Sequence, residues 1–238
     1  MADRRVTLPG LAVMKSQGQK IACLTAYDAS FARAIDAAGI DLVLVGDSLG
    51  MVIQGAETTL AVTLDQLVYH TTCVAQGVRH GFVLADLPFM TSATPAEAAE
   101  NAARLIRAGA HAVKIEGAGP QIQIIRFLTE RHVAVCAHLG LLPQAVHRLG
   151  GYKTQGRDDA SAQQLLADAD ALVAAGAALL VLECIPADLA RAVTERVPVP
   201  TIGIGAGPHC DGQVLVLHDM LGLTPKQPSF SRNFLDGA

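Results

Sequence analysis

The stretch FVLADLPFMTSATPAEAAENAARLIRAGAHAVKIE, Phe82–Glu116, contains the local pattern from which the fold is predicted. It begins with the run Phe82–Leu87, which is apolar at odd and even positions alike, as a strand covered on both faces is. Helical spacing follows over Thr94–Ala108, which opens with the capping-box sequence Thr-Pro-x-Glu and stops at Gly109. A second apolar run, Ala112–Ile115, completes the unit. This order predicts two parallel strands joined by a helix.

The same order recurs along the chain. Eight short apolar runs predict eight strands: Ile21–Ala26, Leu42–Val45, Phe82–Leu87, Ala112–Ile115, Val133–His138, Ala178–Cys184, Thr201–Ile204 and Gln213–His218. Helical spacing lies between most of them, in Asp28–Ala38, Leu64–Gln76, Thr94–Ala108, Gln121–Glu130, Ser161–Ala175 and Ala187–Glu195. About 30 residues per unit is typical of a (β/α)8 TIM barrel. We therefore expect a single α/β barrel domain over residues 1–238.

Two further observations refine the fold prediction. A doubly wound open sheet is the alternative, but it would have fewer strands and a phosphate-binding glycine loop near its start, which we do not find. After the eighth run only Leu221–Ala238 remains, with two prolines and little helical spacing. We therefore expect the last barrel helix to be short or missing.

Composition narrows the class of protein. Of the 238 residues, 51% are hydrophobic and 17% charged, which excludes an intrinsically disordered chain. The 18 Lys and Arg residues are outnumbered by 22 Asp and Glu residues, giving a net charge of −4. This balance argues against nucleic-acid and membrane partners, because their surfaces attract basic patches. An anionic small molecule still fits, since one Lys or a bound metal ion suffices to hold it.

The cysteines and the N-terminal sequence indicate in which cellular compartment the protein is expected. The five cysteines are scattered and odd in number, which favours reduced thiols over disulfides or a zinc site. The segment MADRRVTLPGLAVMKSQG is interrupted by Pro9, Gly10 and Lys15 and lacks the apolar core of a signal peptide. No apolar run approaches the roughly 18–20 residues that span a bilayer. We expect a cytoplasmic protein.

Ionisable residues end five consecutive predicted strands, the second to the sixth. In a parallel barrel the carboxyl ends of the strands meet at one mouth, where the chemistry takes place. The residues brought to this mouth are Asp47, Asp86, Lys114, Glu116, His138 and Glu183. They are the candidate site residues.

Asp47 and Asp86 lie on neighbouring predicted strands, at their carboxyl ends, and such strands lie about 5 Å apart in a sheet. Two carboxylates this close repel each other unless a proton or a cation lies between them. A hard cation with oxygen ligands, Mg²⁺ by preference, satisfies both, and Glu116 is placed to bind it directly or through a water molecule. No His or Cys accompanies these acids, which argues against zinc. For a lone Asp after a strand, a helix N-cap would be the better interpretation.

Three further residues, Lys114, His138 and Glu183, indicate how a substrate would be bound and converted. Lys114 shares a strand face with Glu116 and suits a substrate carboxylate or enolate oxygen, with an ion pair to Glu116 as the alternative. His138 either donates to the same anion or is a buried core residue. Glu183 follows Ala-Leu-Leu-Val-Leu, and a carboxyl group with such apolar neighbours suits acid–base catalysis. With a metal ion, the set predicts proton abstraction next to the carbonyl of a 2-oxo acid.

Two loops are also candidates for a role at the mouth. Leu141–Asp159 is a long insertion that carries Tyr152, Lys153 and Arg157, and it is either a lid or a solvated loop. Gly203–Gly207 resembles a nucleotide-binding loop only superficially, because a strand rather than a helix follows it. Its bare backbone would instead let a substrate approach closely.

Over nearly its whole length the chain resembles the ketopantoate hydroxymethyltransferase family. The motifs are Leu24–Asp28 (LTAYD), Val45–Gly50 (VGDSLG), Ala85–Phe89 (ADLPF), Ala112–Gly117 (AVKIEG), Ala137–Leu141 (AHLGL), Gly151–Arg157 (GYKTQGR), Leu182–Cys184 (LEC) and Gly203–Gly207 (GIGAG). Because so many motifs occur in the same order as in the family, the resemblance is specific to this family. Met90–Ala96 and Glu116–Gly119 depart from the family pattern and affect the expected folate contacts, and the chain stops earlier than is usual in the family.

The resemblance implies a barrel of the phosphoenolpyruvate mutase and isocitrate lyase type. It also implies transfer of a hydroxymethyl group from 5,10-methylenetetrahydrofolate to 3-methyl-2-oxobutanoate (2-oxoisovalerate) through a Mg²⁺-bound enolate. The product would be 2-dehydropantoate (ketopantoate), a precursor in pantothenate and coenzyme A biosynthesis. A homo-oligomer is implied too, often a decamer of two stacked pentamers. The matching positions are Asp47, Asp86 and Glu116 for Mg²⁺, Asp47, Ser48, Asp86, Lys114 and His138 for the oxo acid, and Glu183 for acid–base catalysis.

Two other functions are weighed against this one. A Mg²⁺-dependent carbon–carbon lyase acting on a 2-oxo or 2-hydroxy acid would use a similar mouth. Such lyases commonly carry a catalytic Cys in the long mid-barrel loop, and Leu141–Asp159 has none. A non-catalytic, metabolite-binding barrel would lose acids from the mouth, whereas all of them are present here.

Overall fold

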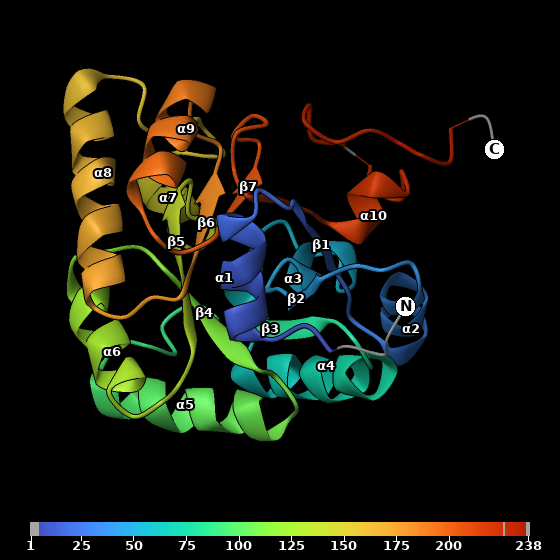
Figure 1. Cartoon of the computed structure of the whole chain (residues 1–238). Helices are drawn as coiled ribbons and strands as arrows, with labels where there is room; N and C mark the ends of the chain where they lie inside the picture. The colour runs from blue at the N-terminus through green and yellow to red at the C-terminus, as the bar shows by residue number, and fades with distance from the viewer. Residues whose placement is uncertain (1–4, 226, 237–238) are drawn as a thin grey trace.

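A closed ring of eight parallel strands forms the centre of the protein in the computed structural model, which describes residues 5–225 and 227–236 (Figure 1). Each strand pairs with the next one in sequence, and β8 pairs with β1. The predicted barrel is therefore confirmed, and the open sheet is excluded. The strands are β1 (Ile21–Thr25), β2 (Leu42–Val45), β3 (Phe82–Asp86), β4 (Ala112–Glu116), β5 (Val135–Gly140), β6 (Leu179–Glu183), β7 (Thr201–Ile204) and β8 (Gly212–Leu215).

Helices cover the outside of this ring. The outer helices that follow β1 to β6 are α2 (Ala29–Ala37), α4 (Leu64–Gly77), α5 (Pro95–Arg107), α6 (Pro120–Thr129), α8 (Asp159–Ala174) and α9 (Ala187–Arg196). Shorter helical turns lie in the loops: α3 (Leu49–Val52), η1 (Thr59–Ala61), η2 (Pro143–Ala145) and α7 (Val146–Leu149). Residues 205–211 join β7 to β8 without a helix. In the described part of the chain only α10 (Leu217–Met220) follows β8, so the closing helix is short, as expected.

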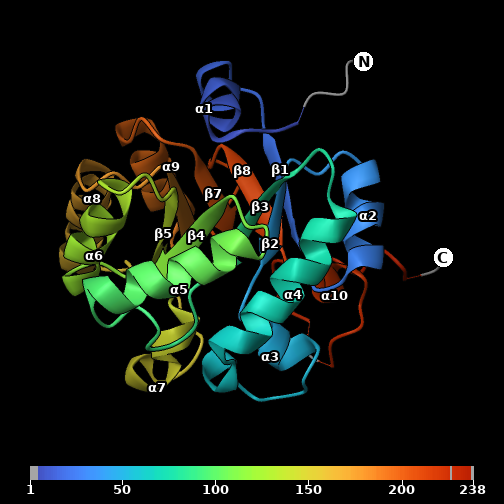
Figure 2. The ribbon, with the colours of Figure 1, turned by 90° about the horizontal axis from the view of Figure 1, so that it is seen from below.

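An N-terminal helix, α1 (Leu8–Ser16), closes the end of the barrel opposite α3 and α7 (Figure 2). Leu11, which is fully buried, and Met14 pack against the inward-facing residues at the start of the strands. Lys15 Nζ donates to Asp211 Oδ2 at 2.7 Å and so ties the helix to the turn before β8. The helix therefore completes the core at the end of the barrel where no chemistry is expected.

This helix is not predicted from the sequence, where Pro9 and Gly10 are treated as interruptions. Thr7 caps the helix by accepting a hydrogen bond from the Gly10 N–H at 3.2 Å. Pro9 lies in the first turn, where a backbone N–H has no partner in the helix and its loss costs nothing. The two residues mark the beginning of a helix.

The end of β8 differs from the sequence prediction for a tertiary reason. The predicted strand Gln213–His218 stops at Leu215, and His218 lies in α10. The Leu217 N–H donates to the side-chain oxygen of Thr25 at 3.1 Å, which takes the backbone out of the sheet.

Among the described residues, no helix is both long and apolar enough to cross a membrane.

We predict that Leu11→Ala lowers the free energy of unfolding by about 2–5 kcal/mol, because it leaves a cavity under the barrel. Val13→Ala is the matched control, since Val13 lies in the same helix and is 50% exposed. It should change the stability by less than about 0.5 kcal/mol. Urea unfolding followed by circular dichroism, at one protein concentration, measures both. Equal small losses would contradict the packing of α1.

Candidate functional site

The strand register places four of the predicted site residues side by side. Asp86 lies opposite Lys114 in the β3–β4 pair, and Glu116 lies opposite His138 in the β4–β5 pair. All four side chains point into the barrel and are no more than 5% exposed. Because side chains alternate along a strand, Lys114 and Glu116 share the inward face, as predicted.

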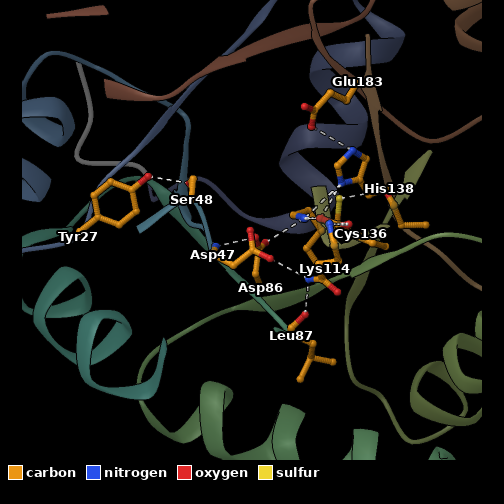
Figure 3. A network of polar contacts seen from close by, with 12 residues as sticks. Tyr27, Asp47, Ser48, Asp86, Leu87, Lys114, Cys136, His138 and Glu183 are labelled. Atoms are coloured by element: carbon orange, nitrogen blue, oxygen red, sulfur yellow. Dashed lines mark hydrogen bonds and ion pairs between the residues drawn. The ribbon is translucent and has the colours of Figure 1, made fainter. Parts of the chain in front are cut away.

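Asp47 and Asp86 are in direct contact at the mouth. The Asp47 N–H donates to Asp86 Oδ2 at 3.0 Å (Figure 3). Gly46 allows this approach, because a Cβ there would lie 2.8 Å from the Ser48 hydroxyl and 3.4 Å from Asp86 Oδ2. Burial, together with repulsion from Asp86 and Glu116, raises the pKa of Asp47. Burial also raises the pKa of Asp86, although Lys114 opposes the effect.

Lys114 carries the permanent positive charge of the cluster. Its Nζ lies 3.2 Å from Asp86 Oδ1, 3.5 Å from Glu116 Oε1 and 3.3 Å from His138 Nδ1. Burial disfavours the charged amine, but the surrounding carboxylates outweigh it and raise its pKa. The ion pair with Glu116 that the sequence offered as an alternative is therefore present. Contact of Lys114 with a substrate anion stays a prediction.

A chain of contacts links Glu116 to Glu183 through His138. Glu116 Oε1 lies 3.6 Å from His138 Nδ1, and His138 Nε2 lies 3.3 Å from Glu183 Oε2 (Figure 3). Burial would raise the pKa of Glu116, but Lys114 and His138 lower it to about 2. Burial and Lys114 disfavour the protonated imidazole, but Glu116 and Glu183 outweigh them and raise the pKa of His138 to about 9. The Glu183 side chain is 16% exposed and is open to a ligand.

Ser48 lies beside the two aspartates and is oriented by Tyr27. The two hydroxyl oxygens are 2.8 Å apart, and Tyr27 is buried (Figure 3). From the sequence, Tyr27 is predicted only as part of the motif LTAYD, without a role of its own. Its place directly after the first predicted strand is the signal that would have found it.

Gln144, in the turn η2 after β5, is a site residue that sequence reasoning missed. Its Nε2 donates to Asp47 Oδ2 at 2.9 Å and to the Leu87 carbonyl at 3.0 Å. Its backbone N–H donates to Glu116 Oε2 at 3.0 Å. One residue thus joins the ends of β2, β3 and β4. Its position near the start of the candidate lid, Leu141–Asp159, was the only signal.

The segment Leu141–Asp159 is anchored beside the site, although much of its middle part is exposed. The Leu141 N–H donates to the Glu183 carbonyl at 2.8 Å, and the Gln155 N–H donates to the Cys184 carbonyl at 2.9 Å. Both ends are therefore held by the end of β6. Between them, the Tyr152 hydroxyl contacts the Met51 sulfur at 3.5 Å, across the mouth. Whether the segment opens as a lid stays a prediction.

The glycine-rich stretch Gly203–Gly207 is explained by packing within the protein. A Cβ at Gly205 would lie 2.8 Å from the Phe230 ring and 3.1 Å from the Cys184 sulfur. A Cβ at Gly207 would lie 2.5 Å from that of Ala187 in α9. Side chains of the protein itself therefore occupy the space beside Gly205 and Gly207, where a close approach of substrate is expected from the sequence. All five cysteines are free thiols.

The acids at the mouth suit a divalent cation that needs few protein ligands. Among the described residues, no three His, Cys, Asp or Glu side chains form a ready-made metal-binding group. Asp86 is nevertheless buried beside Asp47, whose N–H donates to Asp86 Oδ2, and Lys114 is the cation that its Oδ1 contacts, at 3.2 Å. Mg²⁺ commonly binds one or two carboxylates and takes its other ligands from water and substrate. Asp47 and Asp86 fit such a site, whereas Glu116 is engaged by Lys114, His138 and Gln144.

Comparison with known proteins identifies the family. The family model described as ketopantoate hydroxymethyltransferase matches residues 5–238. The chain belongs to this family. The 3-methyl-2-oxobutanoate hydroxymethyltransferase of Methylococcus capsulatus is 60% identical over 98% of this chain and 87% of its own length. The protein of the same name from Nitrosococcus oceani is 57% identical over 98% of this chain and 89% of its own length. The chain is an enzyme of the ketopantoate hydroxymethyltransferase family.

Solved structures show the same barrel type at low sequence identity. A putative phosphonomutase from Burkholderia cenocepacia has a TM-score of 0.69 at 20% identity, over 90% of this chain and 95% of that one. A 2,3-dimethylmalate lyase of the phosphoenolpyruvate mutase/isocitrate lyase superfamily has a TM-score of 0.66 at 18% identity, over 91% of this chain and 82% of that one. This likeness shows the fold alone, which is the predicted type of barrel.

We predict that Gln144→Leu loosens the segment Leu141–Asp159. The variant loses two hydrogen bonds, one to a carboxylate, which together contribute roughly 2–4 kcal/mol. Backbone amides of the segment should therefore exchange with deuterium at least about tenfold faster in the protein without added ligand. Mass spectrometry of peptides measures the rates, with Gln155→Leu as control, because that side chain bonds only within the segment, to the Lys153 carbonyl. Equal rates in both variants would show that Gln144 does not hold the segment.

Proposed function

We propose that this enzyme transfers a hydroxymethyl group from 5,10-methylenetetrahydrofolate to 2-oxoisovalerate and forms 2-dehydropantoate. The observation that carries the proposal is the buried cluster of Asp47, Asp86 and Lys114, with Glu183 facing it through His138. A small 2-oxo acid is the substrate class that such a cluster suits. The names of the relatives, given above, support the transferred group and the acceptor.

Asp47 and Asp86 are the residues that would hold Mg²⁺. When bound, this ion supplies electrophilic polarisation of the substrate's carbonyl oxygen and so acidifies the neighbouring carbon. Related support comes from a phosphonopyruvate hydrolase that was solved with oxalate and Mg²⁺; it has a TM-score of 0.69 at 14% identity, over 94% of this chain and 84% of that one. Glu116 is best placed to orient Lys114 and His138 and to meet the ion through a water molecule.

The other residues bind the oxo acid and move its proton. Lys114, His138 and the Ser48 hydroxyl are the donors available to the carboxylate and oxo groups of the substrate. Glu183 takes the proton from C3, because its side chain faces the cluster and remains partly exposed. His138 Nε2, 3.3 Å from Glu183 Oε2, orients the Glu183 carboxylate toward the cluster.

The reaction balances with water as the third reactant. The C3–H bond breaks, and C3 forms a bond to the methylene carbon of the folate. Both bonds from that carbon to nitrogen break, and water supplies the hydroxyl group. The proton from C3 and the second proton of water end on the two nitrogen atoms, which gives tetrahydrofolate. The product would enter pantothenate and coenzyme A biosynthesis.

A carbon–carbon lyase is the second candidate, and one observation bears on it. The segment Leu141–Asp159, which contacts the mouth through Gln144, carries no Cys, whereas such lyases commonly have a catalytic Cys in this loop. We therefore rank the carbon–carbon lyase below hydroxymethyl transfer as the function of this protein. Assembly as a homo-oligomer, with a decamer as the expected form, is likewise part of the proposal.

We predict that Glu183→Gln binds 2-oxoisovalerate with an affinity within about threefold of the unchanged protein but forms 2-dehydropantoate at least about 10²-fold more slowly. The amide keeps the shape of the side chain and cannot accept the proton. Calorimetry with Mg²⁺ measures binding, and product formation with 5,10-methylenetetrahydrofolate measures turnover. An unchanged rate would assign the base to another residue. Absence of product from the unchanged, folded protein would reject the proposed reaction.

A further inference from the structure

The C-terminal segment, residues 227–236, lies beside the mouth of the barrel, and the proposed reaction does not yet use it (red in Figure 1). Its Gln227 side chain and its Phe234 N–H donate to backbone carbonyls of α10, at 3.0 Å and 2.9 Å. The segment is therefore fixed at two points on the short helix that follows β8. Between these points, Phe230 reaches the ends of β6 and β7.

Cys184, directly after the proposed base Glu183, bends the chain at the end of β6. Its φ is 46°, in the left-handed region that residues with a side chain seldom adopt, so its neighbours must hold the bend. The Cys184 N–H donates to the Ile204 carbonyl at 2.9 Å, and the Cys184 carbonyl accepts from the Gln155 N–H at 2.9 Å. Because Glu183 and Cys184 share a peptide group, relaxation of the bend would change the direction of the Glu183 carboxylate.

Phe230 supports the side-chain end of this bend. A Cβ at Gly205 would lie 2.8 Å from the Phe230 ring and 3.1 Å from Cys184 Sγ, so the ring and the sulfur flank the same glycine. Contacts between sulfur and aromatic rings are favourable. Phe230 is 40% exposed, so most of this side chain is covered although its segment lies at the surface. Loss of the ring would leave a gap into which the bend at Cys184 can relax.

We propose that Phe230 is a positioning residue for the proposed base Glu183, an inference that rests on the proposed function. Phe230 packs beside Cys184 and Gly205, holds the bend after β6, and so keeps the Glu183 carboxylate in reach of C3 of the oxo acid. Small displacements matter, because a shift of about 1 Å at a reacting group can slow a reaction about 10²-fold. The C-terminal segment thus acts on the chemistry without touching the substrate.

The experiment measures the base directly, by exchange of the C3 proton of 2-oxoisovalerate in D₂O with Mg²⁺, on the whole protein. Phe230→Ala removes the ring, and Phe230→Leu keeps most of its apolar volume. Phe234→Ala is the matched control, since this ring belongs to the same segment and is 57% exposed. Calorimetry measures the binding of 2-oxoisovalerate to each variant, and urea unfolding shows that each variant is folded.

We expect Phe230→Ala to slow the exchange at least about tenfold, whereas Phe230→Leu and Phe234→Ala stay within about threefold of the unchanged protein. Binding of 2-oxoisovalerate should stay within about threefold in all variants, because the donors of the site are left in place. An unchanged exchange rate in Phe230→Ala would overturn the inference. An equal loss of oxo-acid binding would overturn it too, because it would mean a general disturbance of the mouth.

A second variant tests the same contact from its other side. Cys184→Ala removes only the sulfur atom and should slow the exchange at least about threefold. If Phe230 acts through Cys184, the variant that carries both Ala substitutions exchanges no more slowly than Phe230→Ala alone, as expected of residues in contact. Multiplied losses in the double variant would overturn the inference. Should Phe230→Ala fail to fold, Cys184→Ala decides alone, and an unchanged rate would then contradict the proposal.

The unchanged protein separates this inference from the proposed function. If the unchanged, folded protein does not exchange the C3 proton, the proposed base fails, and the role of Phe230 fails with it. If it exchanges the proton and Phe230→Ala does so equally fast, only the role of Phe230 fails, and the proposed reaction stands.

Discussion

Carboxylates buried side by side repel each other strongly, because little water is present to screen them. Asp47, Asp86 and Glu116 are nevertheless held together at the mouth of the barrel by strand register and by Lys114. Lys114 is ion-paired with Asp86 and Glu116 and offsets only part of the negative charge of the three carboxylates. The cluster is therefore costly when nothing is bound, and a divalent cation relieves that cost. The proposed chemistry depends on this imbalance of charge.

The loops convert this charged cluster into a site of defined shape. Gln144 donates hydrogen bonds to Asp47 and to Glu116. The two ends of the segment Leu141–Asp159, which contains Gln144, are held by the backbone carbonyls of Glu183 and Cys184. The proposed base and the segment that covers the site therefore share one anchor, the end of β6. At the end of the barrel opposite α3 and α7, α1 packs on the starts of the strands, so packing of the core and the proposed chemistry lie at opposite ends of the strands (Figure 2). This division is common in barrels of this type.

The sequence predicts most of the site because a parallel barrel turns local positions into spatial neighbours. Asp86 and Lys114 lie one strand apart, and the regular spacing of apolar runs is enough to place both at the mouth. The residues that were missed depend on contacts that no local pattern encodes. Gln144 lies in a loop without periodicity, and the strand before Leu217 ends early because of a hydrogen bond to Thr25, which lies far away in sequence.

The central claim, that this cluster makes C3 of 2-oxoisovalerate acidic, is tested most directly by proton exchange. The protein is incubated with 2-oxoisovalerate in D₂O, and the C3 proton is followed by NMR with Mg²⁺ or with EDTA, each with and without tetrahydrofolate. The account predicts loss of the C3 signal in Mg²⁺ and retention of the signal in EDTA. Retention of the signal in all four samples of folded protein, or equal loss with Mg²⁺ and EDTA, would contradict it.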